Sequence, residues 1–394
     1  MSLSYRFSRT RSAAVLGIAL AAATTAVSVP ALAPPSVSAA TTRVSSIVLA
    51  DGSTRTLTTP ADLAVSVYAR GLPSARFMAL GPRGDVFVGS WTAGTVSVLL
   101  NRTSGKQAAQ VKTLLRGLTV PHGVAYNKGL LYVGEEGQVS SYQYNAANAS
   151  LSNRTVVVPH LPTGGRHVTR TVAIGPDKML YVTVGSSCNE CVDEATRALV
   201  MRYKLDGSGG TVFASGLRNT VGIAWQPKTG RLFGADNGRD FLGENLPPDE
   251  IDLLQQGGVY GWPYCYGAGL ADPLLSSASG YCARTIEPAR SLQAHSAPLG
   301  VAYGTGTLAP ARYRRGIFVA YHGSAYRSRL TGYKVVYIQI DGATVGTPQD
   351  VVTGWLAGST FWGRPVGLLV AADGSLLVSD DDVGVVYRVA LVGR

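Results

Sequence analysis

Segment 164–194, GGRHVTRTVAIGPDKMLYVTVGSSCNECVDE, shows the pattern that decides the fold. A polar loop holding His167 leads into a short apolar run, 172–174. A Gly-Pro-Asp turn then leads to a second apolar run, 180–184, and a polar turn with two cysteines ends the segment. Two short apolar runs bounded by turn residues predict a pair of antiparallel strands. His167 then lies at the rim of a sheet, where rigidly held loops often carry binding or catalytic groups.

The same unit of strand, turn and strand recurs six times along the chain. The innermost runs of the six units are spaced 45, 48, 51, 78 and 67 residues apart, at Ala79, Val124, Val172, Ile223, Val301 and Leu368. Outer apolar runs follow most units, so each unit supplies about four strands, as a propeller blade does. We therefore predict an all-β fold, a six-bladed β-propeller of four-stranded antiparallel blades, with insertions after the fourth and fifth blades. A sandwich of the same strands is the alternative, but it does not require six similar units.

The apolar run 63–69, LAVSVYA, precedes the first blade and has no blade of its own. We expect it to pair with the last blade and close the ring, because closure removes the exposed strand edges that invite aggregation. Residues 41–394 are then predicted to form a single propeller domain.

The N-terminus has the order of features that is typical of a secretory signal. Three arginines precede an Ala-rich apolar run, 13–33, and small residues follow it. We expect residues 1–40 to be a signal peptide and the mature protein to be periplasmic or secreted, with no membrane span.

The charge of the chain argues against nucleic-acid binding. The formal net charge is +11, and it becomes +8 without residues 1–40, which hold three arginines and no acidic residue. The remaining basic residues are scattered, whereas a nucleic-acid footprint is clustered. We therefore expect no nucleic-acid partner.

Four cysteines follow the apolar run: Cys188, Cys191, Cys265 and Cys282. Disulfides persist in exported proteins. Proximity favours the pairs Cys188–Cys191 and Cys265–Cys282, although the two other pairings remain open from sequence. A CxxC can also bind zinc or act in redox exchange, but no second CxxC and no nearby His pair accompanies it.

Basic residues recur at one position of the repeat, directly before the innermost run. They are Arg76, His122, His167 with Arg170, Arg218 with Asn219, His295 and Arg364. The innermost strands of a propeller surround its centre, so these residues are expected to converge at one mouth of the central channel. A cationic ring of this kind fits an anionic ligand, with histidine available as a base. Alternatively, the side chains tie neighbouring blades together by hydrogen bonds.

A longer series of motifs resembles the pyrroloquinoline quinone (PQQ)-dependent sugar dehydrogenase family, which contains glucose, aldose and sorbosone dehydrogenases. The motifs are HVTRTVAIGPD (167–177), GLRN (216–219), DEIDLLQQGGVYGWP (249–263), HSAPLG (295–300), HGS (322–324) and GRPVGLLVAADGSLLVSDD (363–381). They follow the family's order over nearly all of the mature chain. HVTR, CNEC and HGS most resemble the sorbosone-dehydrogenase-like branch. The fold of the family is a six-bladed propeller, in agreement with the repeat count.

The resemblance implies an oxidoreductase that transfers hydride from an aldose or a sugar-derived aldehyde to PQQ. His167 corresponds to the family's catalytic base, which takes the proton from the substrate hydroxyl. Arg218 corresponds to the arginine beside the quinone carbonyls, where a fixed cation stabilises negative charge as it develops. Asn219 and Arg364 correspond to further PQQ-contacting positions.

The resemblance also implies two Ca²⁺ sites, which use the oxygen ligands that this ion prefers. Gly238 and Arg239 fall where the family offers backbone carbonyls to a Ca²⁺ that bridges protein and PQQ. Asp249, Glu250 and Tyr260 fall on a structural Ca²⁺ site.

The chain departs from the glucose enzymes in two of their PQQ contacts. The lysine that follows their counterpart of HSAPLG is missing, and Val366 replaces the second of their paired arginines. Other basic residues are therefore candidates for holding PQQ, namely Arg76, Arg170, Arg327 and Arg329. A CxxCH haem-attachment motif is also missing, so electrons are expected to pass to a separate acceptor, a quinone or a cytochrome.

Other functions remain open from the sequence. A propeller that has lost its cofactor would serve as a carbohydrate-binding or interaction module. A metal-dependent lactonase on this fold would need acidic and Asn ligands around the axis, whereas the axial set here is His and Arg. The acidic run 380–382 is expected to be a solvated turn.

Overall fold

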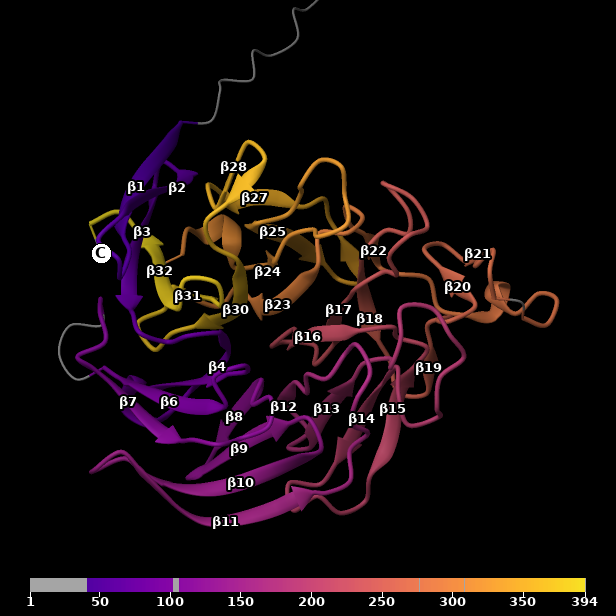
Figure 1. Ribbon diagram of the computed structural model, residues 1–394, viewed down its shortest axis with the longest axis horizontal. Coiled ribbons are helices and arrows are strands. Elements are labelled where there is room, and N and C mark those ends of the chain that lie inside the picture. The colour runs from indigo at the N-terminus through magenta and orange to yellow at the C-terminus, as the bar shows by residue number, and fades with distance from the viewer. Residues whose placement is uncertain (1–40, 102–105, 276, 308, 394) are drawn as a thin grey trace, which may run out of the picture. The chain divides into compact units, whose positions relative to one another are not determined.

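The computed structural model describes residues 41–101, 106–275, 277–307 and 309–393 (Figure 1). The predicted signal peptide, residues 1–40, lies outside the described residues. Regular structure within them consists of β-strands and three short 3-10 helices, η1 (Pro82–Gly84), η2 (Cys282–Arg284) and η3 (Ala311–Tyr313). No helix in the described ranges is both long and apolar enough to cross a membrane.

Six sheets follow one another around a common centre, which confirms the predicted six-bladed propeller (Figure 1). Blade 1 contains β4 (Ala75–Leu80), β5 (Val86–Ser90), β6 (Thr95–Leu100) and β7 (Gln110–Leu115), and blade 2 contains β8 (Gly123–Asn127), β9 (Leu130–Glu135), β10 (Gln138–Asn145) and β11 (Ser150–Val158). Blade 3 contains β12 (Val172–Ile174), β13 (Leu180–Val184), β14 (Leu199–Tyr203) and β15 (Thr211–Ser215), and blade 4 contains β16 (Thr220–Trp225), β17 (Leu232–Asp236), β18 (Glu250–Leu254) and β22 (Arg290–Ser291). Blade 5 contains β23 (Pro298–Tyr303), β24 (Gly316–Tyr321), β25 (Lys334–Asp341), β26 (Thr344–Val345) and β27 (Gln349–Val352), and blade 6 contains β30 (Pro365–Val370), β31 (Leu376–Asp380), β32 (Val385–Leu391) and β3 (Leu63–Ala69).

Strand β3 closes the ring, as predicted from the run 63–69. It pairs antiparallel with β32, from Leu63 opposite Leu391 onward. The edge of the last blade is thereby covered by the beginning of the same domain.

The N-terminal residues 42–60 form a hairpin that the sequence pattern did not predict. Its strands are β1 (Thr42–Val48) and β2 (Thr54–Pro60). Their outward residues are polar apart from Val44 and Val48, whereas Ile47 and Leu57 enter the core cluster that also contains Trp355. Two inward side chains are too few to give a visible apolar period, so the hairpin is stabilised mainly by what it packs against.

Strands in the middle of the blades are buried on both faces, because a neighbouring blade packs on each side. All five residues of β5, of β17 and of β31 are buried. Strands buried on both faces read as continuous apolar runs, which is why the repeat was visible in the sequence.

An apolar cluster crosses the centre of the propeller. Val221 of β16, Leu299 of β23 and Val366 of β30 are buried together, and Phe77 of β4 packs against them. Val366 corresponds to the position at which the glucose dehydrogenases named above have the second of two paired arginines. Its side chain is 0% exposed. A charged side chain at this position would be buried among apolar ones, which is costly.

The two long units differ in where their extra residues lie. In the fourth unit the insertion lies within the blade, between β18 and the outer strand β22, rather than after it as predicted. It contains β19 (Gly258–Val259), β20 (Cys265–Tyr266) and β21 (Leu270–Ala271), of which β19 pairs with β15 of blade 3. In the fifth unit the hairpin of β28 (Leu356–Ala357) and β29 (Thr360–Phe361) follows the last strand. Spacing between inner strands measures the length of an insertion but not its place in the blade.

Both disulfides that proximity favoured are formed. Cys188 pairs with Cys191 and Cys265 pairs with Cys282, and no cysteine is free. The CxxC sulfurs are therefore bonded to one another and offer no thiolate to zinc.

Candidate active site

Loops that precede the inner strands line a cavity of about 200 Å³. Five members of the predicted basic ring and its neighbours reach it: His167, Arg218, Asn219, His295 and Arg364. They are joined there by Asn237, Gly238, Asp240 and Asp249. The cavity is therefore lined by two arginines, two histidines, amide groups and two carboxyl groups from blades 3 to 6.

His167 is held by one of its two ring nitrogens. Its Nδ1 lies 2.9 Å from the backbone oxygen of Ser186 and 2.8 Å from the Ser186 hydroxyl oxygen. A carbonyl oxygen only accepts hydrogen bonds, so Nδ1 must carry the proton and donate it. The other nitrogen, Nε2, is then left with a free lone pair.

The imidazole of His167 is neutral at ordinary pH. Burial, followed by the positive charge of Arg218, lowers its pKa from 6.5 to about 3. Both effects disfavour the charged form of a base. A neutral imidazole with an unprotonated Nε2 has the protonation state that a general base needs.

Gly185 explains why His167 and Asn219 can lie against the same stretch of backbone. A Cβ atom at this position would be 2.6 Å from the Cβ of His167 and 2.7 Å from the Oδ1 of Asn219. These distances are shorter than van der Waals contact, so only glycine fits here.

Arg218 is 4% exposed and is held entirely by amide oxygens. Its guanidinium donates to the carbonyls of Asn189, Asn237 and Gly238 at 2.9, 3.1 and 2.9 Å, and to the side-chain oxygen of Asn189 at 2.8 Å. None of these four acceptors is a carboxylate. The charge of Arg218 is therefore fixed in place without being neutralised by contact.

A buried carboxylate at the end of the second strand fixes the turn that carries each arginine. Asp236, at the end of β17, accepts the backbone amides of Arg218 and Asn219 at 3.0 and 2.8 Å. Asp380, at the end of β31, accepts the amide of Arg364 at 2.9 Å. The same arrangement, an aspartate that accepts the backbone amide of the arginine, thus positions Arg218 in blade 4 and Arg364 in blade 6.

The side chain of Arg364 crosses the cavity wall beside blade 5. It donates to the carbonyls of His322 and Gly323 at 3.3 and 3.0 Å. Its guanidinium lies over the rings of Tyr333 and Phe361, at 5.7 and 5.6 Å from their centres. Aromatic faces hold a cation without neutralising it.

A second, much smaller cavity of about 30 Å³ lies under the same loops. Glu250 and Tyr260 line it together with Asp236 and Asp272, and its volume suits one ion rather than an organic molecule. Burial, and then the charge of Asp236, raise the pKa of Glu250. Two residues further along β18, both carboxylate oxygens of Asp252 are buried without a hydrogen-bond partner among the described residues. Buried acidic oxygens of this kind fit a hard cation such as Ca²⁺.

Comparison with known proteins gives the family. The model of the TrAA12-like family matches residues 57–391. The chain belongs to this family. It is 25% identical to a pyrroloquinoline quinone-dependent sugar dehydrogenase of Hypocrea jecorina, over 68% of this chain and 75% of the relative. This confirms the relationship to the PQQ-dependent sugar dehydrogenases, whereas the closer likeness to the sorbosone branch stays a prediction.

Two solved structures of similar proteins share the fold. The calcium structure of the Trichoderma reesei family AA12 enzyme has a TM-score of 0.75 and 22% identity, covering 84% of this chain and 96% of the other. The holo form of the PQQ domain of Coprinopsis cinerea pyranose dehydrogenase has a TM-score of 0.72 and 23% identity, covering 85% and 97%. At these identities the likeness concerns the arrangement of the blades.

Four arginines named as candidates for holding a cofactor in this family member lie away from the cavity. Arg76 pairs with Asp381 at 2.6 Å inside the protein. Arg170 is 0% exposed and donates to the carbonyls of Pro162, His167 and Thr169. Arg170 therefore fixes the loop that carries His167 and does not reach the cavity.

Arg327 and Arg329 belong to the long connection between β24 and β25. Arg327 donates to the carbonyl of Ala294 and to the side chain of Asn245, at 3.1 and 3.2 Å. It braces the segment 239–248 against blade 5. Arg329 is exposed and does not line the cavity.

The run 380–382 is not the solvated turn that we expected. Asp380 is 0% exposed, and Asp381 binds Arg76 through one oxygen and His322 through the other, the latter at 2.8 Å. Arg76 in turn donates to Nδ1 of His122 at 3.2 Å. The hydrogen bonding between blades that was the alternative for the basic ring is therefore found at these positions.

The five residues predicted to bind metal have different surroundings. Glu250 and Tyr260 line the small cavity, whereas the two oxygens of Asp249 accept the backbone amides of Gly238 and Ala297 at 2.9 and 3.0 Å. Burial raises the pKa of Asp249 to about 7. The Arg239 side chain pairs with Asp272 at 2.7 Å. Asp249 thus clamps the loop of Gly238 to blade 5.

Sequence reasoning missed two residues that support the site. Ser186 binds Nδ1 of His167, and Asn189 binds the guanidinium of Arg218. For Asn189 the CNEC motif was the available signal, because a polar residue between two bonded cysteines has a restricted backbone. His295, left undecided above, donates from Nε2 to the carbonyls of Gly243 and Leu246 and so holds segment 239–248 over the cavity.

Proposed function

We propose that the protein is an exported PQQ-dependent dehydrogenase that oxidises an aldose or a sugar-derived aldehyde such as sorbosone. The observation that carries the proposal is one cavity that holds both a neutral histidine with a free Nε2 and an arginine whose charge is not neutralised. Dehydrogenation of an alcohol needs both a base for the hydroxyl proton and stabilisation of negative charge on the hydride acceptor. The Hypocrea jecorina relative, a PQQ-dependent sugar dehydrogenase, supports the same class of reaction.

The residues present fit an anionic cofactor. PQQ carries three carboxylates, and when bound it supplies the quinone that accepts hydride. Arg364 of blade 6 and Asn219 of blade 4 line the cavity and would hold it, and Arg218 would lie beside its quinone oxygens. A guanidinium that already rests on two aromatic rings binds a carboxylate without having to be reoriented first.

His167 would take the substrate proton at Nε2, while Ser186 keeps Nδ1 protonated and the ring in place. An anion beside Arg218 offsets the positive charge that depresses the pKa of His167. The histidine therefore becomes a stronger base when the cavity is filled.

Ca²⁺ would bind at two places. Glu250 and the backbone carbonyl of Tyr260 would hold a structural ion in the small cavity. The carbonyls of Gly238 and Arg239 would offer oxygens to a second ion, which would supply a Lewis acid for the reaction. The carbonyl of Gly238 already accepts from Arg218, but an amide oxygen has a second lone pair.

The test is calorimetric titration of PQQ into chelator-stripped protein with and without Ca²⁺, followed by dye reduction with aldoses and sorbosone. We expect tight PQQ binding that depends on Ca²⁺, and dye reduction with at least one sugar. A separate acceptor, a quinone or cytochrome, would replace the dye in the periplasm or outside the cell. If PQQ binds under neither condition, the dehydrogenase is excluded and a carbohydrate-binding module becomes the better explanation.

A further inference from the structure

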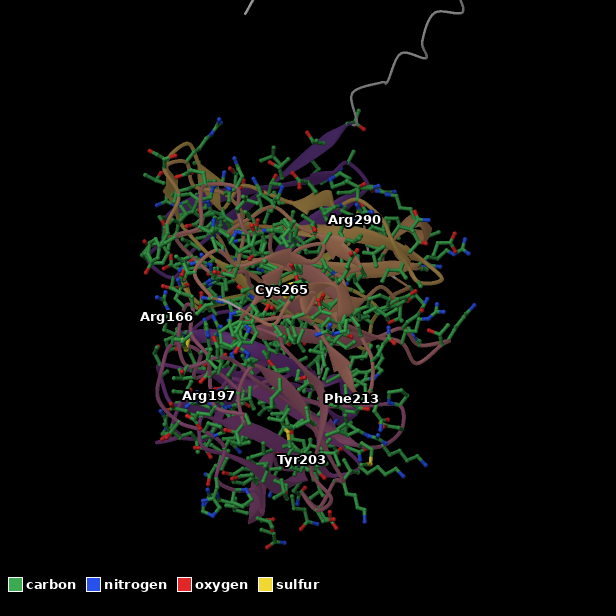
Figure 2. All side chains as sticks on the ribbon, turned by 90° about the vertical axis from the view of Figure 1, so that its right-hand side faces the viewer. Arg166, Arg197, Tyr203, Phe213, Cys265 and Arg290 are labelled. Carbon is green, nitrogen blue, oxygen red and sulfur yellow. A yellow bond between two sulfur atoms is a disulfide. The ribbon has the colours of Figure 1, made fainter. Side chains whose placement is uncertain are left out.

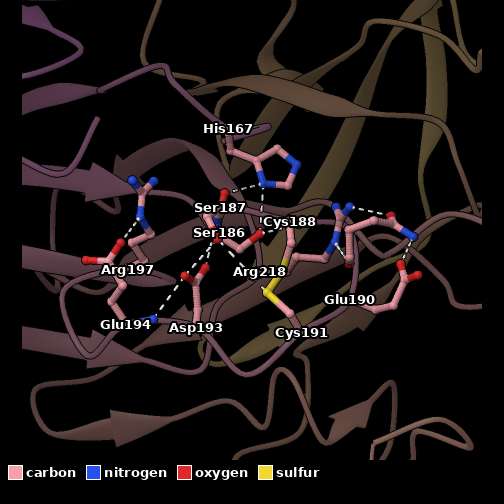
Figure 3. The surroundings of a disulfide bond; sticks show 11 residues. His167, Ser186, Ser187, Cys188, Glu190, Cys191, Asp193, Glu194, Arg197 and Arg218 are labelled. Atoms are coloured by element: carbon pink, nitrogen blue, oxygen red, sulfur yellow. Dashed lines mark hydrogen bonds and ion pairs between the residues drawn. A yellow bond between two sulfur atoms is a disulfide. The ribbon is translucent and has the colours of Figure 1, made fainter. Parts of the chain in front are cut away.

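The loop 188–191, closed by the Cys188–Cys191 disulfide, touches the supports of both functional side chains (Figure 3). It follows β13 and does not itself line the cavity. Its four residues offer three oxygens toward the site. These oxygens are the backbone carbonyl of Cys188 and the backbone and side-chain carbonyls of Asn189.

Asn189 binds Arg218 twice. Nε of Arg218 donates to the backbone oxygen of Asn189 at 2.9 Å, and Nη2 donates to its Oδ1 at 2.8 Å. Two acceptors from one residue fix both the position and the plane of a guanidinium. Asn189 is 8% exposed, so solvent does not compete strongly for these bonds.

Asn189 also binds the rim of the cavity. Its Oδ1 accepts the backbone amide of Asp240 at 2.8 Å, and its Nδ2 donates to the backbone carbonyl of Asp240 at 3.1 Å. Asp240 lines the cavity and pairs with Arg166 at 3.1 Å. Arg166 is labelled at the left margin of the side view (Figure 2). One side chain therefore joins Arg218 to the segment 239–248.

The other end of the loop reaches His167 through Ser186. The Ser186 hydroxyl donates to the carbonyl of Cys188 at 2.8 Å, so its oxygen is free to accept from Nδ1 of His167. If the Cys188 carbonyl moved away, the hydroxyl could turn so that it no longer accepts, and Nδ1 would keep only the Ser186 carbonyl as an acceptor among the described residues. The carbonyl direction thus helps to keep Nε2 unprotonated.

We propose that the disulfide-closed loop 188–191 positions Arg218 and His167 for the reaction, with Asn189 as the main positioning residue. The inference rests on the proposed dehydrogenase function. A ring closed over four residues restricts the directions of its carbonyls, and supports of this kind keep a charged group aimed where charge develops.

The test compares Asn189→Ala and the double variant Cys188→Ser/Cys191→Ser with Val192→Ala, an exposed neighbour of the loop that serves as the control. Variants are used because a thiol reductant would also reduce a quinone. We expect Asn189→Ala to lower kcat about 10- to 100-fold while KM for the sugar changes less than about 3-fold, and the double variant to lose at least as much. Val192→Ala should match the parent protein.

A second readout needs neither cofactor nor substrate. Amide hydrogen exchange of the cofactor-free parent protein should show strong protection at Asp240, whose amide donates to Asn189, and little at the exposed residues Phe241, Glu244 and Asn245. Asn189→Ala keeps the disulfide and should lose the Asp240 protection selectively. An unprotected Asp240 amide in the parent, or a folded Asn189→Ala protein with unchanged kcat, would overturn the proposal. If the parent oxidises no sugar, the proposed function fails, and the exchange experiment still tests the contact.

Discussion

Two halves of the basic ring use the same residue types for opposite purposes. On the side of blades 3 and 4, His167 and Arg218 bind only amide and hydroxyl oxygens and line a cavity. In the other set, Arg76 of blade 1 binds His122 of blade 2 and Asp381 of blade 6, and Asp381 also binds His322 of blade 5, all inside the protein. The repeat places a basic residue before each inner strand in both halves.

The partners decide the difference. A carboxylate in contact with an arginine neutralises it and lets the pair be buried as a connection between blades. Backbone carbonyls hold an arginine just as firmly but leave its charge in place for a ligand. The active side of the ring is therefore the side on which no acidic side chain contacts the arginine.

The largest expected effect is on activity, and it distinguishes His167, which lines the cavity, from His122, which is buried away from it. His167→Asn should lower kcat/KM about 10²- to 10⁴-fold, because it removes the proposed general base. His122→Asn should leave the kcat of the folded protein within about 2-fold, since His122 is buried away from the cavity. Dye-reduction kinetics on both variants, with folding checked by circular dichroism, give the answer. Equal losses in the two variants would mean that the ring is not divided as described.

Removing one arginine from each half should give opposite patterns of damage. Arg76→Met leaves Asp381 buried with only His322 as a partner, which should cost about 3–5 kcal/mol in the free energy of unfolding. Arg218→Met leaves only carbonyl oxygens without their donor and should lower the free energy of unfolding by about 1–3 kcal/mol. It should nevertheless abolish most of the activity. Urea denaturation measures the first quantity and dye reduction the second. The double variant Arg76→Met/Asp381→Asn should recover much of the stability, and a failure to do so would count against the ion pair.

The repeat made most of the fold predictable, because strands that are buried on both faces give each blade two apolar runs around a turn. It also located His167, Arg218, Asn219 and Arg364, which precede inner strands in equivalent places. It could not tell the two halves apart, since the partner that neutralises Arg76 lies 305 residues away in the chain.

The hydrogen bonds by which neighbouring loops hold the site residues could not be predicted from the sequence either. Asn189 reaches Arg218 from another blade, and nothing in CNEC shows which way its amide points. The hairpin of residues 42–60 shows the same limitation, because Ile47 and Leu57 are buried by distant residues rather than by a pattern of their own.

Arg364 should matter for cofactor affinity more than for folding. Arg364→Ala removes a charge-assisted contact worth about 1.5–3 kcal/mol, so the Kd for PQQ should rise roughly 10- to 100-fold. Arg327→Ala is the matched control, because Arg327 belongs to the neighbouring connection but does not line the cavity. Calorimetric titration at two salt concentrations measures both. A larger loss of affinity from Arg327→Ala than from Arg364→Ala would reassign the cofactor contact.

The smallest expected effect concerns the acidities of His167 and His322. Burial is the largest cause that lowers the pKa of each, to about 3 and about 4, but the nearest charge differs in sign. Arg218 lowers the pKa of His167, whereas Asp381 raises that of His322. Arg218→Met should therefore raise the pKa of His167, and Asp381→Asn should lower the pKa of His322 further.

Nitrogen NMR of the five histidines during a pH titration of the cofactor-free protein measures both shifts and shows which ring nitrogen of His167 carries the proton. Because both folded pKa values lie below the unfolded value near 6.5, the unfolded chain binds more protons below that pH. The contribution of the two histidines to stability is complete above pH 6.5 and falls as the pH drops toward 4, by on the order of 1–2 kcal/mol for His322 at pH 5. If neither substitution shifts the pKa of its histidine, burial alone sets both values, and the contrast between amide-held and carboxylate-held halves does not extend to the histidines.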